Sequence, residues 1–181
     1  MNYYGAKELA DSFRTVRKNT ITIANEIAEE HYGFRAAPET RTVGQTLVHI
    51  AHICELAERL HGFERRTALE GFDFPGFIGP LIADEHTPRS KAQVIDLLRT
   101  AGDRYSAWLD GLSDEFLGER VALMPGMTPA SKTRFEMLLG VKEHEMHHRG
   151  QLMLVERMLG IVPHLTREYQ ARMAAAAASK Q

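Results

Sequence analysis

Nine histidines occur among the 181 residues of this chain, and two of them have the spacing of a metal-ligand pair. His144 and His148 lie four residues apart in a segment whose apolar residues recur with helical periodicity. Both imidazoles would therefore project from one helix face, one turn above the other. Two imidazoles so placed can reach one ion, whereas a single buried histidine is more often a hydrogen-bonded core residue. The pair predicts a metal site.

A third histidine, His49, belongs to another helical segment. At about 100° per residue, His49 falls on the same side as Leu56 and Leu60, which directs it toward the core. His52 falls with Glu55 on the side of the helix that we expect to be more exposed to solvent. Three neutral imidazoles with an open fourth position are the ligand set of a catalytic zinc site, and they suit nickel, iron or copper nearly as well.

These histidines must be positioned by helices, because strand signals are almost absent. Only residues 120–123 could form one short extended piece. Capping-box patterns open three segments, at Thr42, Ser90 and Thr133. The sequence therefore predicts an all-α fold, a four-helix bundle with long connections and a short C-terminal helix. We expect helices over residues 6–31, 42–61, 90–109, 133–159 and 166–178, with a bundle domain at 1–165 and a helical tail at 166–181.

Two connections, residues 62–89 and 110–130, are longer than usual for a bundle. The first contains Phe72, Phe74 and Phe77 in a stretch that otherwise reads as a loop. These aromatic side chains could form a lid over the bundle or simply plug one open end of its core, and the sequence leaves both alternatives open.

The composition excludes several classes of function. The net charge of −2 gives no basic excess for binding phosphates, so we expect no nucleic-acid partner. No apolar run approaches the roughly 18 residues that span a bilayer, and the first residues lack the apolar core of a signal peptide. The single cysteine, Cys54, fits a reducing compartment and a buried structural role better than that of a nucleophile. We expect a cytoplasmic protein.

Residues 42–50 (TVGQTLVHI) and 144–152 (HEMHHRGQL) resemble the two signature segments of the DinB/YfiT-like family of metalloenzymes. The resemblance implies a four-helix bundle that holds one divalent metal on His49, His144 and His148. Zinc or nickel is the expected metal, with iron or manganese as alternatives. The resemblance also implies that the protein forms homodimers and acts on a small-molecule substrate.

The family also suggests the kind of reaction. Its members of known activity resemble thiol-dependent enzymes, S-transferases that use bacillithiol or related low-molecular-weight thiols and a mycothiol-dependent isomerase. We therefore expect thiol transfer. The alternatives are a hydrolase that uses water bound to the metal, and a non-catalytic metal-binding stress-response protein.

The segment His144-Glu145-x-x-His148 also matches the zincin motif, in which the glutamate is a general base and Glu168 could serve as third ligand. Against this interpretation, no strand precedes the motif and His49 is left unexplained. We therefore expect Glu145 to be solvated or to lie behind the ligands. Surface positions are expected for His31, His61, His86 and His164.

Overall fold

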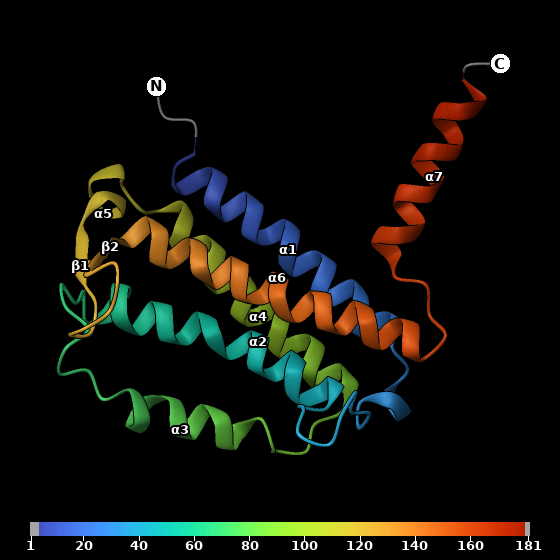
Figure 1. Ribbon diagram of the computed structural model, residues 1–181, viewed down its shortest axis with the longest axis horizontal. Coiled ribbons are helices and arrows are strands. Elements are labelled where there is room, and N and C mark those ends of the chain that lie inside the picture. Colours follow the sequence, from blue (N-terminus) through green and yellow to red (C-terminus); the bar gives the residue numbers. More distant parts are fainter. Residues whose placement is uncertain (1–3, 180–181) are drawn as a thin grey trace.

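The computed structural model describes residues 4–179, and its centre is a bundle of four helices (Figure 1). The bundle helices are α1 (Ala6–Glu26), α2 (Val43–Ala57), α4 (Lys91–Asp110) and α6 (Arg134–Met158). Around them lie α3 (Phe74–Asp84), α5 (Asp114–Gly118), β1 (Arg120–Ala122), β2 (Ser131–Thr133) and α7 (His164–Ala178). The predicted all-α four-helix bundle is confirmed. None of the helices within residues 4–179 is long and apolar enough to cross a membrane.

The two helices that carry the candidate ligands begin at their predicted caps. At the start of α2, the Thr42 hydroxyl accepts a hydrogen bond from the Gln45 amide at 3.1 Å, and the Gln45 side chain accepts one from the Thr42 amide at 3.0 Å. Thr133 and Glu136 form the same box at the start of α6. At its other end α6 stops before Gly160, whose φ of +80° suits glycine.

Arg17 of α1 connects all four bundle helices at one level. Its guanidinium forms an ion pair with Glu145 of α6, with Nη2 and Oε2 at 3.0 Å. It also donates to the backbone oxygens of Leu98 in α4 at 2.6 Å and Ile50 in α2 at 3.3 Å. Gly102 leaves room for this side chain, because a Cβ there would lie 2.8 Å from Arg17 Cγ. The bundle therefore has a polar node inside its apolar core.

This node lies next to the candidate ligands in sequence. Ile50 follows His49, and Glu145 follows His144. Because Arg17 binds both neighbours, it links α2 and α6 beside the cluster.

Three parts of the sequence prediction need correction. The first helix ends at Glu26 instead of residue 31, because Ile27 adopts an extended conformation and is buried in the core. The connection 62–89, expected to be a loop, contains the helix α3. The extended piece is half of a hairpin, in which β1 pairs with β2 antiparallel and Val121 lies opposite Lys132.

Phe72 and Phe74 pack at the end of the bundle that carries the hairpin. They contact a small buried cluster of Leu60, Leu69 and Val121. This packing corresponds to the plug, one of the two alternatives for the aromatic residues of this connection.

The C-terminal helix α7 projects away from the bundle, as Figure 1 shows. It starts at His164, two residues before the predicted start. The division into a domain at 1–165 and a tail at 166–181 stays a prediction, and its outermost residues lie outside the described part of the chain.

Glu156 of α6 gives a pH-dependent prediction. The residue is fully buried, and neither carboxylate oxygen has a hydrogen-bond partner within residues 4–179. Burial, and then the charge of Glu26, raises the pKa of Glu156 from its ordinary 4.5 to about 7. A carboxyl group whose pKa is higher in the folded than in the unfolded protein contributes its full stabilisation at a pH below the unfolded pKa. That contribution is lost as the pH rises through the pKa of the folded state.

Replacement of Glu156 by Gln should therefore leave stability at pH 5 nearly unchanged and raise it by about 2 kcal/mol at pH 8. Urea unfolding at the two pH values measures this difference. Glu143→Gln is the matched control, because Glu143 is an exposed acid on the same helix. Equal effects of the two substitutions on stability at pH 8 would contradict the raised pKa of Glu156.

Candidate metal centre

The structure brings His49, His144 and His148 together. Nε2 of His144 lies 3.0 Å from Nε2 of His49 and 3.2 Å from Nε2 of His148. One ligand atom from each residue lies within 4.8 Å of the other two. The three residues that the sequence selected thus form one cluster between α2 and α6, and their role as metal ligands stays a prediction.

Two of the three imidazoles are oriented through their second nitrogen. Nδ1 of His49 donates to Oε1 of Glu85 at 2.7 Å, and Arg41 holds the other oxygen of that carboxylate at 2.6 Å. Nδ1 of His148 donates to Oε1 of Gln151 at 2.8 Å. With the proton on Nδ1, Nε2 keeps its lone pair for a metal. Carboxylate or amide partners of this kind are typical behind metal-bound histidines.

The charge state of the cluster also suits a cation. Burial lowers the pKa of each of the three histidines, and for His144 the neighbouring imidazoles lower it further, to about 3. All three rings are then neutral at pH 7, which is the form that binds metals. Nε2 of His49 and Nε2 of His148 both lie about 3 Å from Nε2 of His144, whose Nδ1 has no hydrogen-bond partner within residues 4–179, and a shared divalent ion would satisfy all three Nε2 atoms. The donor set therefore fits zinc or nickel.

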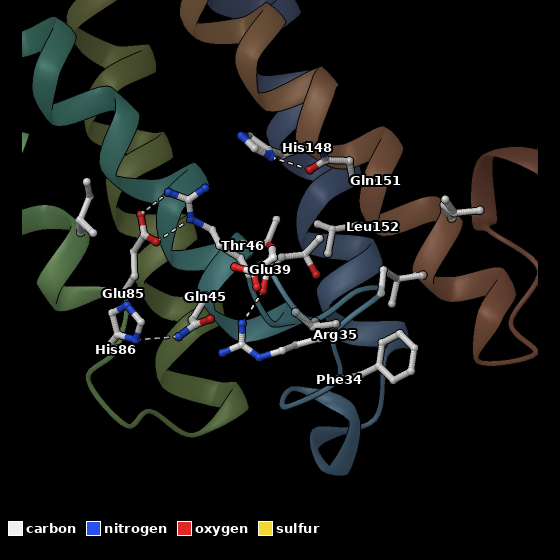
Figure 2. Close-up of a pocket in the computed structure, with 17 residues that line it drawn as sticks. Phe34, Arg35, Glu39, Gln45, Thr46, Glu85, His86, His148, Gln151 and Leu152 are labelled. Atoms are coloured by element: carbon white, nitrogen blue, oxygen red, sulfur yellow. Dashed lines mark hydrogen bonds and ion pairs between the residues drawn. The ribbon is translucent and has the colours of Figure 1, made fainter.

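A pocket of about 570 Å³ opens beside the cluster (Figure 2). His148, Gln151 and Leu152 of α6 line one side, and the segment from Phe34 to Thr46 lines the other. The walls combine apolar side chains with the charges of the residues Arg35, Glu39, Arg41 and Glu85. Because His148 belongs to this lining, a small molecule in the pocket would reach the cluster.

The prediction that His52 faces water is wrong. Its exposed fraction is only 8%, because the unpredicted helix α3 ends against it. Nε2 lies 2.9 Å from Oδ2 of Asp84, and Nδ1 lies 2.9 Å from Oε1 of Glu55. Burial opposes protonation of His52, but the two carboxylates outweigh it and raise the pKa. His52 is therefore held between two acids and is not part of the cluster.

Of the two alternatives expected for Glu145, the solvated position is wrong. Its exposed fraction is 0%, and both carboxylate oxygens bind Arg17. A carboxylate committed to a buried ion pair is not available as the general base of a zincin. Glu168 is exposed on α7, the helix that projects from the bundle, and the residue that lies beside His144 and His148 is His49. These observations exclude the protease interpretation.

Two histidines expected on the surface are buried. Nδ1 of His61 lies 3.0 Å from Nη1 of Arg134, and Nε2 of His164 lies 3.4 Å from Oδ1 of Asn19. Both are hydrogen-bonded core residues. Cys54 is buried as expected, and burial raises the pKa of its thiol to about 12, so it cannot act as a nucleophile near neutral pH.

Glu85 and Arg41, which together orient His49, were not predicted from the sequence. Glu85 follows directly after α3. The apolar residues of that segment, its Asp73 cap and the proline after Phe74 were the signals that could have revealed the helix and the acids at its end.

Comparison with known proteins identifies the family. The sequence profile of the DinB superfamily matches residues 12–152. The chain belongs to the DinB superfamily. A comparison with curated proteins finds no match.

Solved DinB-like structures share the fold. YfiT from Bacillus subtilis, described as a probable metal-dependent hydrolase with an unusual four-helix bundle topology, is similar with a TM-score of 0.68 at 16% identity, covering 89% of this chain and 91% of YfiT. A DinB-like protein from Bacillus cereus has a TM-score of 0.67 at 18% identity over 90% of this chain and 97% of its own. The DinB-like protein YjoA from Bacillus subtilis has a TM-score of 0.62 at 20% identity over 84% and 92%. At these low sequence identities, the structural similarity shows a shared fold and nothing further about function.

Proposed function

We propose that this DinB protein binds one divalent metal through His49, His144 and His148 and catalyses thiol transfer to a small molecule. The observation that carries the proposal is the convergence of three neutral imidazoles beside a pocket of about 570 Å³. A divalent ion held there would lower the pKa of a bound thiol or water molecule, and so supply a nucleophile near neutral pH.

The surroundings of the cluster are compatible with a bound thiol as the nucleophile. The pocket contains two carboxylates, Glu85 and Glu39. Glu85 is already bound by His49 and Arg41, and Glu39 lies on the exposed rim. A thiol needs no further base, because its pKa of about 8.5 is low enough for a metal to deprotonate it outright. The nucleophile must come from outside the protein, since Cys54 is buried.

The test is an assay of the metal-loaded protein with monochlorobimane as electrophile, in the presence and absence of bacillithiol, mycothiol or glutathione. We expect conjugation to require both the metal and one of the thiols. With cobalt in the site, that thiol should add a sulfur-to-cobalt charge-transfer band to the near-ultraviolet spectrum. If turnover and the charge-transfer band both persist when the thiol is omitted, thiol transfer is contradicted.

A hydrolase is the second candidate, because YfiT is described as a probable metal-dependent hydrolase. Release of p-nitrophenol from p-nitrophenyl acetate, dependent on metal but not on thiol, would favour this alternative.

A further inference from the structure

The end of α3 carries two consecutive acids that each meet a histidine of α2. Oε1 of Glu85 lies 2.7 Å from Nδ1 of His49, and Oδ2 of Asp84 lies 2.9 Å from Nε2 of His52. His49 and His52 are three residues apart, so they lie on one face of α2. Two neighbouring carboxylate–imidazole contacts therefore join α3 to the helix that carries a candidate ligand.

Apolar packing holds the start of α3, where Phe74 contacts the buried cluster of Leu60, Leu69 and Val121. None of the residues from Phe74 to Asp84 is buried, and Pro80 removes a hydrogen-bond donor within the helix. A helix of 11 residues is marginal without tertiary support. The Glu85 carboxylate and the His52 ring are shielded, with exposed fractions of 6% and 8%, whereas the Asp84 side chain is 35% exposed. Polar contacts, which also include Arg41 with Glu85 and Gln45 with His86, thus anchor the C-terminal end of this helix.

Asp84 is itself held from the far side by Arg89. Nη2 of Arg89 lies 2.7 and 2.6 Å from the two carboxylate oxygens, and Nη1 donates to the backbone oxygen of Asp84 at 2.8 Å. Asp84 therefore lies fixed between Arg89 and His52, one residue before Glu85.

We propose that His52 and Asp84 are positioning residues of the metal centre: their contact fixes the end of α3 against α2, and this places the Glu85 carboxylate on Nδ1 of His49. The inference rests on the metal site proposed above. When the contact is lost, Glu85 moves with the loosened end of α3 and orients His49 for only part of the time.

The test compares two alanine variants that each remove one carboxylate from the same imidazole. Asp84→Ala removes the carboxylate that belongs to α3, whereas Glu55→Ala removes the one on α2 itself, which cannot join the two helices. We expect Asp84→Ala to weaken cobalt affinity about tenfold and to change the visible absorption spectrum of bound cobalt, as outer-shell substitutions do. Glu55→Ala should leave the affinity within about twofold and the spectrum unchanged.

Hydrogen exchange of the metal-free protein gives a readout that does not depend on the metal. Asp84→Ala and the second variant His52→Gln should speed amide exchange within residues 74–84, and Glu55→Ala should not. Equal cobalt affinity and spectrum in Asp84→Ala and wild type, or equal effects of the two alanine variants, would overturn the proposal. A wild-type protein that binds no cobalt would instead refute the metal site, while the exchange data would still report whether Asp84 anchors α3.

Discussion

Replacement of His148 by Ala should strip the purified protein of stoichiometric metal. The substitution removes one of three converging ligand atoms and the imidazole that Gln151 orients. Substitution of a residue that only hydrogen-bonds to a metal ligand costs about 10- to 100-fold in metal affinity, so loss of a ligand itself should cost at least about 100-fold. Elemental analysis after dialysis, together with chelator competition for zinc, measures the effect.

The neighbouring His147 provides the matched control. It belongs to the same motif but is exposed and lies outside the cluster. The His147→Ala variant should keep its metal and its affinity within about threefold of wild type. Equal metal content in His148→Ala and wild type, or an equal loss in both variants, would show that the imidazoles do not act as the proposed site.

The second large effect is expected at the Arg17–Glu145 ion pair. Substitution of Arg17 by Met leaves the Glu145 carboxylate buried without its partner and should cost about 3–5 kcal/mol of unfolding free energy. In a chain of this length each kcal/mol corresponds to roughly 2–4 °C in Tm, so a decrease of about 10 °C is expected. Urea unfolding and calorimetry measure both quantities, and a loss below about 1 kcal/mol would contradict a buried pair.

The double variant Arg17→Met, Glu145→Met separates this structural role from catalysis. Because it removes both charges, it should recover much of the lost stability. It should also keep its metal, since neither residue belongs to the cluster. If Glu145 were instead a general base, Glu145→Gln would abolish turnover while leaving stability almost unchanged.

The sequence was sufficient to predict the helices that position the site because their signals are local. Thr42 and Thr133 open capping boxes, and both boxes are present in the structure. The apolar stripe of α6 then places His144 and His148 on one inward face, and His49 follows from the same periodicity in α2.

The environment of His49 could not be predicted in the same way. Glu85 and His49 are 36 residues apart, and they meet only because α3 folds back along α2. That helix has no buried residue and thus lacks the strong amphipathic pattern that reveals a helix from sequence. Its absence from the prediction also explains why His52 was expected to face water. The choice between the two alternatives for Glu145 could not be made from the sequence, because its partner Arg17 lies 128 residues away.

The measurement that tests the central claim most directly is the metal content and metal coordination of the wild-type protein, produced without an affinity tag so that no nickel column supplies the ion. Elemental analysis should find one divalent ion per chain. X-ray absorption should place about three imidazole nitrogens at roughly 2.0–2.1 Å from it if the metal is zinc. A protein that contains no metal as purified and takes up neither zinc nor nickel on titration would contradict the account.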